Sequence, residues 1–539
     1  MHNSVLLALW AGISFVLYKI ACSIIVSRKR AATARQLGCL PAPPLELVPF
    51  DPLGIHNIAI LIQADKNSLV PQWMEERHKR ACAKAGREIT TFHQNVMGGE
   101  NYFTIEPKNI QAILATQFKD FGLGIVRNRN FSPLLGHGIF STDGEQWAGA
   151  RALLRPQFAR DQVSDLELEE QHVQHLLQAI PKNANGWTDV TDIEPLFFRL
   201  TIDSATEFLF GESVDSQLSA LPGYKSSRAP LAISEQDFGV AFDRAQAQIS
   251  TATRFGDASW LVFSGDRSHI QRCHSFIDHY VQLALSKDKS RPQSPSSDKK
   301  QKYIFLDALV ESTRDPVELR THLISILLAG RDTTASLLSY IFMCFAQHPH
   351  VYQHLRSVVL STFGTYSSPQ NLTFEALKSC AYLQWVINET LRLYPVVPID
   401  GRRALRDTTI PTGGGPDGTA PIFVQKDTNV EYSVYVMHRR KDLWGPDADK
   451  YRPERWDGRK AGWEYLPFNG GPRICIGQQF ALVEAAYTIV RLTQKFERIE
   501  SAGNLWDPVE KGGEGIIKHK LSLTMCPDGV RLRMKEAAE

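Results

Sequence analysis

One segment of about 30 residues, between Asp315 and Pro349, limits the fold more than any other part of this chain. Its apolar residues recur at helical spacing on several faces, which predicts a helix about 45 Å long that is buried through the middle of a large body. Asp315 suits the N-cap, Pro316 suits the first helical position, and Glu318 completes a capping box. Pro349 ends the helix.

Two further helices are predicted, from Ala381 to Leu393 and from just after Cys475 to Leu492. Short strand-like pieces and glycine-rich turns lie between Ile399 and Val430. The polar segment from Lys287 to Lys302 is rich in Ser, Pro and Lys and predicts a surface loop. This mixture predicts a mainly α fold with small β-sheets.

The composition excludes several classes of protein. Hydrophobic residues make up 43% and charged residues 22% of the 539 positions, so a wholly disordered chain is excluded. The net charge of +2 offers no electrostatic case for binding nucleic acid. The eight cysteines are scattered and form no CxxC pair, which argues against a disulfide scaffold or a zinc module.

The N-terminal segment from Val5 to Val26 predicts a single transmembrane helix. It would span about 33 Å, enough for a hydrocarbon core of about 30 Å, and Lys19 can reach the interface. The basic run at 28–30 follows the apolar segment, which places the body in the cytosol by the positive-inside rule. The alternative, a cleaved signal peptide, needs positive charge before the apolar core, and none is present there.

The segment from Phe468 to Gly477 contains two glycines and a proline, and a helix follows it. Cys475 is therefore expected where free backbone N–H groups and the positive end of the helix dipole lower a thiol pKa. Arg473 adds positive charge, and a thiolate in this setting can ligate iron. The alternative is an ordinary buried cysteine in a glycine-rich turn.

The spacing of Phe468, Gly471, Arg473, Cys475 and Gly477 resembles the haem-binding signature of the cytochromes P450. The resemblance implies that Cys475 is the axial ligand of haem b, iron-protoporphyrin IX. It also implies that Phe468 packs beside the sulfur, that Arg473 meets a haem propionate and that Gly477 lets the haem approach the helix.

The stretch AGRDTT at 329–334 interrupts the long helix at its centre and is similar to the family's oxygen-activation motif. Threonine hydroxyls can distort a helix by bonding to the preceding turn. The resemblance implies a groove beside Gly330 and a proton relay through Asp332 and Thr333. The alternative is a seam of small residues where helices cross.

Glu389 and Arg392 lie three positions apart on one helical face, a spacing that is also common in exposed ion pairs. In the family such a pair is buried and joined by a further arginine, here Arg455 in Pro453–Trp456. The implied triad is structural and holds the cysteine loop.

Trp147 and Arg151 resemble the family's propionate-binding helix, and Arg402 matches a further propionate arginine, although the adjacent Arg403 competes. The motifs occur in the family's order. The resemblance thus implies an anchor at 1–30, a proline-rich hinge at 31–50 and a cytochrome P450 catalytic domain at 51–539.

Segments at 131–136, 153–158 and 465–481 look like those of the fungal n-alkane and fatty-acid ω-hydroxylating P450s. The implied enzyme is a single-pass protein of the endoplasmic reticulum membrane with a cytosolic catalytic domain and an apolar substrate. Electrons from NADPH would arrive through NADPH–cytochrome P450 reductase, docking on the cysteine side near a basic patch with Arg151 and Arg155. The alternative is a P450 that oxidises a polyketide or terpenoid secondary metabolite.

Three rival classes remain. A P450-fold isomerase or dehydratase acting on hydroperoxides does not need the Asp332–Thr333 pair. A non-catalytic haem sensor has little use for a proton relay, and a membrane-anchored interaction protein without haem does not need the Cys475 loop.

Overall fold

The computed structural model describes residues 2–45, 51, 53–158, 166–183, 185–224, 235–262, 266–286, 303–502, 506–507 and 516–538. Helices predominate in it, which confirms a mainly α fold with small β-sheets. The predicted surface loop at 287–302 lies outside the described residues. The helices are α1 (His2–Gln36), α2 (Ile55–Lys66), α3 (Val70–Ala85), α4 (Pro107–Gln111), α5 (Gly124–Leu135), α6 (Gly144–Leu154), α7 (Leu166–Gln178), α8 (Glu194–Phe210), α9 (Ser216–Ser219), α10 (Glu235–Arg254), α11 (Ser268–Ser286), α12 (Phe305–Ser312), α13 (Pro316–Gln347), α14 (Pro349–Phe363), α15 (Phe374–Ser379), α16 (Ala381–Leu393), α17 (Val434–Met437), α18 (Lys441–Trp444) and α19 (Gln478–Lys495).

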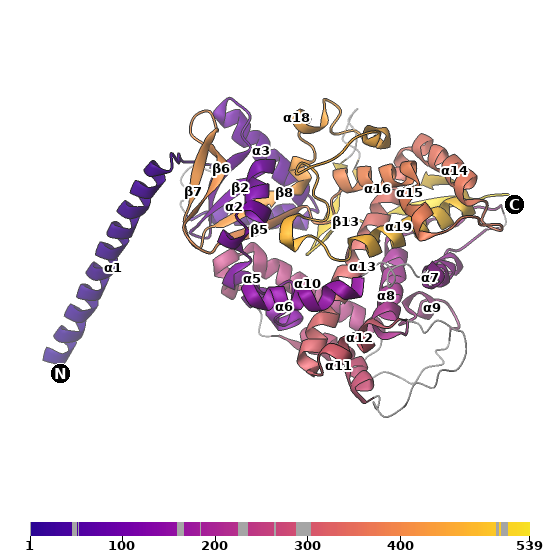
Figure 1. Ribbon diagram of the computed structural model, residues 1–539, viewed down its shortest axis with the longest axis horizontal. Coiled ribbons are helices and arrows are strands. Elements are labelled where there is room, and N and C mark those ends of the chain that lie inside the picture. Colours follow the sequence, from indigo (N-terminus) through magenta and orange to yellow (C-terminus); the bar gives the residue numbers. More distant parts are fainter. Residues whose placement is uncertain are drawn as a thin grey trace.

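Helix α13 is the predicted central helix, and it packs against α8, α11, α16 and α19 (Figure 1). The side chain of Asp315 accepts the backbone N–H groups of Val317 at 2.8 Å and Glu318 at 3.4 Å, so the N-cap is confirmed. The predicted capping box is wrong, because Glu318 does not accept the backbone N–H of Asp315. The Glu318 carboxylate accepts the Thr313 hydroxyl at 2.6 Å, and the backbone N–H of Asp315 donates to that same hydroxyl.

The interruption predicted at 329–334 is also wrong, because α13 runs through it as a continuous helix. The Thr333 hydroxyl donates to the carbonyl of Ala329 at 2.6 Å, and the Ser336 hydroxyl donates to that of Asp332 at 2.7 Å. Both bonds add to the helix without replacing its backbone ladder.

A five-stranded sheet in the order β1-β2-β8-β5-β3 forms one side of the body, next to α2 and α3 (Figure 1). Four strands, β5 and β8 of this sheet and the separate pair β6 and β7, lie within or overlap the segment 399–430 in which short strands were predicted. The strands are β1 (Thr91–Val96), β2 (Gly99–Thr104), β3 (Phe121–Gly122), β4 (Thr191–Asp192), β5 (Ile399–Ala404), β6 (Thr408–Gly414), β7 (Ala420–Val424), β8 (Asn429–Ser433), β9 (Phe496–Ser501), β10 (Trp506–Asp507), β11 (Ile516–Ile517), β12 (His519–Leu521), β13 (Met525–Pro527) and β14 (Arg531–Glu536).

Helix α1 projects away from the body (Figure 1). It is longer than the predicted segment and includes the basic run at 28–30. The span Val5–Gln36 contains a stretch that is long and apolar enough to cross a membrane, and none of that stretch is buried against the body. At its body end, Arg30 pairs with Asp407 at 2.8 Å and donates to Gln425 at 2.8 Å.

The segment after α1 is bound to the body, which differs from the hinge predicted at 31–50. The backbone N–H of Leu40 donates to Pro421 on β7 at 2.9 Å, and the N–H of Leu45 donates to His93 on β1 at 2.8 Å. Ala42 and Leu45 are buried in the core. Of the predicted hinge, 31–36 is helix, 37–45 joins the sheets, and 46–50 lies outside the described residues.

Candidate functional site

The cysteine loop is folded back on itself just before α19. The backbone N–H of Cys475 donates to the carbonyl of Phe468 at 3.0 Å, and the N–H of Gly477 donates to the Cys475 sulfur. Gly471 has φ of 66°, and a Cβ there would lie 2.0 Å from the carbonyl oxygen of Leu114. Only glycine fits at that position. The predicted tight loop before a helix is thus confirmed.

The Cys475 thiol faces accessible space inside the body. Its side chain is exposed, yet surrounding protein raises its pKa, an effect that outweighs the hydrogen bond from Gly477 and the charge of Arg151. The predicted lowering by a backbone N–H group and by a nearby arginine is present, although the arginine is Arg151 and burial outweighs both, because the sequence pattern does not show the depth of burial. A metal ion deprotonates a thiol that coordinates it, so this raised pKa does not oppose ligation.

Arg473 lies directly over the predicted tryptophan. Its guanidinium carbon is 4.4 Å from the centre of the Trp147 ring, and its Nη2 donates to Asp143 at 2.6 Å and to the carbonyl of Thr142 at 3.0 Å. Its Nε and Nη1 are buried and have no hydrogen-bond partner among the described residues. Two donor nitrogens of one buried arginine are thus available to an acceptor that the described residues do not supply.

Arg402 and Arg403 point to opposite faces of β5. Arg402 is buried and donates to Asp400 at 2.8 Å. Arg403 turns the other way and binds both carboxylate oxygens of Asp257, at 2.9 and 3.0 Å. Arg402 therefore lies on the same side of β5 as Arg473, and its charge helps to lower the pKa of Arg473. Arg403 lies on the other side and does not belong to the arginine group around Trp147.

Three charged residues near these arginines have no motif in the sequence. Asp143 accepts the N–H groups of Leu123 and Gly124, each at 2.9 Å, besides holding Arg473. Arg127 on α5 pairs with Asp400 at 2.9 Å. Burial alone would raise the pKa of Asp400, but its two arginine partners outweigh burial and hold the pKa well below its usual range.

The charge of this group matches a dianionic acceptor. Arg127, Arg402 and Arg473 face the two carboxylates, which leaves one positive charge in excess. Half-buried Arg151, whose guanidinium lies 6.0 Å from the Trp147 ring, adds a second. The two propionates of haem carry two negative charges and accept hydrogen bonds. The residues present therefore fit haem, with Cys475 as the available sulfur ligand.

The two predicted relay residues have different environments. Thr333, with Ala329 and Gly330, is partly exposed in the middle of a buried helix, so this stretch borders accessible space inside the body. Asp332 is buried and lies 3.1 Å from Arg331, which also pairs with Asp243 at 2.6 Å. Burial raises the pKa of Asp332, and the charge of Arg331 opposes that rise.

The predicted triad of Glu389, Arg392 and Arg455 is assembled and buried. Arg392 binds both carboxylate oxygens of Glu389 at 2.9 Å, and Arg455 donates to the same carboxylate at 2.8 Å. The indole of Trp456 and the backbone N–H of Arg452 complete its shell, at 3.1 and 2.9 Å. Arg455 also pairs with Asp447 at 3.3 Å, so the two buried guanidinium groups face two carboxylates, as burial of ionic groups requires.

A histidine without a sequence motif joins this triad to the cysteine loop. The remaining nitrogen of Arg392, Nη1, donates to the carbonyl of His438 at 2.7 Å. Nδ1 of His438 bonds to the carbonyl of Arg392 at 3.0 Å, while its Nε2 accepts the N–H of Leu466 at 3.0 Å. The triad thereby contacts the chain two residues before Phe468.

The sequence pattern described as Cytochrome P450 matches residues 68–527. The chain belongs to the cytochromes P450. The P450 is 49% identical over 530 residues to "Cytochrome P450 monooxygenase g430" of Fusarium sp, covering 97% of this chain and 90% of that protein. It is 46% identical to "Cytochrome P450 52A10" of Candida maltosa, covering 83% and 84%. It is 42% identical to "Cytochrome P450 monooxygenase alt2" of Alternaria solani, covering 92% of each.

A solved structure supports the fold. A crystal structure titled as a cytochrome P450, CYP102L1, superposes with a TM-score of 0.70 at 22% identity and covers 93% of this chain and 99% of that one. The predicted family and fold class are confirmed. Together with the family, the fungal relatives show that the P450 is a haem-dependent monooxygenase, so the haem-free, sensor and isomerase alternatives are not supported.

Proposed function

We propose that this P450 hydroxylates a long aliphatic chain, a fatty acid or an alkane, at or near its end. The support is the resemblance of segments 131–136, 153–158 and 465–481 to the fungal ω-hydroxylating P450s. Relatives named Cytochrome P450 52A5, 52A10 and 52A12, from Candida maltosa and Debaryomyces hansenii, are 43–46% identical to this chain.

Each side chain of the site has a part in this proposal. Cys475 would hold the haem iron, and Nε and Nη1 of Arg473, which have no partner among the described residues, would donate to a propionate, beside Arg402 and the indole of Trp147. Arg151 supplies further positive charge near the thiolate, whose pKa it lowers. Bound haem supplies the iron at which dioxygen is activated.

Helix α13 would supply the protons that this chemistry needs. The Thr333 hydroxyl, now bonded to the carbonyl of Ala329, can turn toward the accessible space beside it and hold a water there. Burial raises the pKa of Asp332 above its ordinary value, which makes the carboxylate a better proton acceptor. Arg331 limits this rise and keeps the carboxylate oriented.

The membrane anchor and the redox partner are part of the same proposal. Helix α1 would cross the endoplasmic reticulum membrane once and leave the catalytic domain in the cytosol, where NADPH–cytochrome P450 reductase delivers electrons. Of the two arginines expected at the docking surface, Arg155 is exposed, whereas Arg151 is half-buried beside Trp147. Arg155 is therefore the better contact for an acidic partner surface.

One observation favours a second substrate class. Among the relatives reported above, the highest identity, 49% over 97% of this chain, is to a Fusarium monooxygenase that does not carry the 52A name. Oxidation of a polyketide or terpenoid secondary metabolite is therefore the competing proposal.

A substrate panel decides between the two. The full-length holoenzyme is titrated with fatty acids and alkanes of about 10 to 18 carbons, the size range of a cavity of several hundred Å³, and with polyketides and terpenoids. We expect a spin-state shift with a long aliphatic chain and a terminal or near-terminal alcohol that forms only with NADPH and reductase. Turnover of a polyketide or terpenoid, with no shift for any aliphatic chain, contradicts the proposal.

A further inference from the structure

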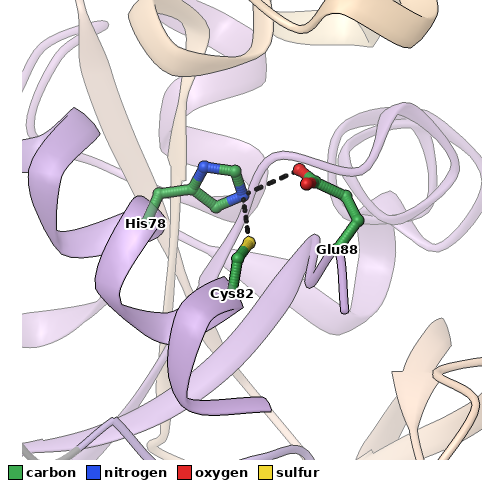
Figure 2. A group of neighbouring side chains, drawn as sticks. All are labelled: His78, Cys82 and Glu88. Carbon is green, nitrogen blue, oxygen red and sulfur yellow. Dashed lines mark hydrogen bonds and ion pairs between the residues drawn. The ribbon is translucent and has the colours of Figure 1, made fainter. Parts of the chain in front are cut away.

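A second group of metal-ligating side chains lies at the end of α3. His78 and Cys82 are one helical turn apart on α3, and Glu88 follows in the loop that leads to β1 (Figure 2). Their nitrogen, sulfur and carboxylate oxygen atoms all lie within 4.8 Å of one another. No part of the haem site described above includes any of the three.

The backbone holds the loop against the helix. Gly86 takes φ of 66° at the C-cap of α3, which turns the chain back. The N–H of Ile89 then donates to the sulfur of Cys82 at 3.3 Å, and its carbonyl lies 2.7 Å from Nε2 of His78. These contacts fix the position from which Glu88 extends its carboxylate.

Two of the three distances between the donors match those around a tetrahedral zinc-like ion, and the third, from sulfur to carboxylate, is within 4.8 Å. Metal–sulfur bonds of about 2.3 Å and metal–nitrogen or metal–oxygen bonds of about 2.0–2.1 Å place sulfur about 3.5 Å from nitrogen and nitrogen about 3.3 Å from oxygen. The sulfur of Cys82 lies 3.5 Å from Nε2 of His78, and that nitrogen lies 3.3 Å from the Glu88 carboxylate. One ion could therefore be bound with small side-chain movements.

We propose that His78, Cys82 and Glu88 bind one divalent cation of the zinc class, which fastens the end of α3 to the start of β1. A thiolate, an imidazole and a carboxylate are the ligand types that Zn²⁺ takes in proteins. His78 is buried and Cys82 half-buried, whereas Glu88 is exposed and gives the ion access from solvent. A water or the Ile89 carbonyl completes four ligands.

Binding moves two protons and forms no covalent bond. The Cys82 thiol releases its proton to solvent as the ion replaces it. Nε2 of His78 gives up its contact with the Ile89 carbonyl, and the ring carries its proton on Nδ1 instead. A neutral imidazole is the form of histidine that binds a metal ion. Two anionic ligands then balance the charge of the ion.

The experiment uses the full-length holoenzyme, freed of metal by a chelator and reloaded with Zn²⁺. Zinc per haem iron is measured by mass spectrometry, and the ligands are measured by X-ray absorption at the zinc edge, where haem does not interfere. We expect one zinc per haem iron, with one sulfur at about 2.3 Å and nitrogen or oxygen at about 2.0–2.1 Å.

Variants assign the ligands. Cys82→Ser removes the sulfur from the zinc spectrum, and Glu88→Gln, an exposed change, weakens zinc binding at least about tenfold. Cys22→Ser, which replaces a cysteine of α1, leaves the zinc spectrum and the zinc affinity unchanged and controls for binding by other thiols. A carbon-monoxide spectrum like that of the wild type shows that each variant is folded. A wild-type protein that binds no zinc, or zinc without sulfur, overturns the proposal, as does full-affinity binding by Glu88→Gln.

Discussion

His438 accepts a hydrogen bond of 3.0 Å at Nε2 from the backbone N–H of Leu466. Its Nδ1 lies 3.0 Å from the carbonyl oxygen of Arg392, which can only accept, so the neutral tautomer is protonated at Nδ1. Leu466 precedes by two residues the carbonyl of Phe468 that holds the N–H of Cys475. The buried triad and the iron ligand are therefore connected through one imidazole ring.

Replacing that ring should loosen the cysteine loop. His438→Leu leaves the N–H of Leu466 and the carbonyl of Arg392 unpaired in the core, and each unpaired group costs about 1–3 kcal/mol. We expect the free energy of unfolding in urea to fall by about 2–5 kcal/mol, with a smaller thiolate-ligated fraction in the carbon-monoxide spectrum. His350→Leu, an exposed change on α14, should alter neither by more than about 0.5 kcal/mol.

The triad itself is more costly to break. Glu389→Gln leaves the buried guanidinium groups of Arg392 and Arg455 without their shared carboxylate, so we expect a loss of about 3–5 kcal/mol in urea unfolding. The exposed Arg452 pairs with Asp447, and Arg452→Gln is the matched control with an effect near zero. Equal effects of the two changes would show that the triad does not support the loop.

Acid should destabilise the protein through two buried histidines. Burial lowers the pKa of His438 and of His519 from 6.5 to about 3, and the ring of His519 is bonded to Tyr340 at 2.8 Å. Between about pH 6.5 and 3 the unfolded chain binds more protons, so stability falls as the pH falls, by about 1.4 kcal/mol per pH unit for each ring.

The contribution of His519 to the pH dependence of stability is obtained by comparing the wild type with a variant that lacks this ring. Burial raises the pKa of Glu484 to about 7 and of Asp203 to about 6, and a carboxyl group with a raised pKa gains stability as the pH falls. The free energy of unfolding is therefore measured from pH 7 to 5 for the wild type and for His519→Phe. We expect the variant to lose less on acidification, by about 1.4 kcal/mol per pH unit. Parallel curves would contradict this assignment.

Replacing the Thr333 hydroxyl tests the proposed proton relay on α13. Thr333→Ala removes the proton donor that borders the accessible space, so product formation should fall by about 100-fold, while NADPH consumption falls less. Thr333→Ser keeps a hydroxyl able to reach Ala329 and should retain most of the activity. Product and NADPH are measured together in the reconstituted system. Equal product yields from both variants would remove Thr333 from the relay.

Local signals predicted the elements around the site well. The bounds of α16 at Ala381 and Leu393 match, because the residue before a proline disfavours helix and Pro395 follows closely. The N-cap at Asp315 could be predicted because capping requires only a side chain that lies two or three residues before free backbone N–H groups. The Cys475 loop was recognisable because its glycines, arginine and cysteine are adjacent in the chain.

Features that depend on distant parts of the chain could not be predicted. Arg127 meets Asp400 across 273 positions, and no motif marks either residue. The sequence left Arg402 and Arg403 as competitors, because only the strand pairing of β5 decides which one turns inward. The pKa of Cys475 depends on how much protein surrounds it, which no local pattern records.

The central claim is that the sulfur of Cys475 ligates the haem iron. The most direct test is the carbon-monoxide difference spectrum of the reduced, full-length protein and of Cys475→Ser. We predict the absorption band characteristic of thiolate-ligated haem in the wild type and its loss in the variant, with the fold preserved by far-UV circular dichroism. A wild type that binds haem without this band, or a variant that retains it, would contradict the account.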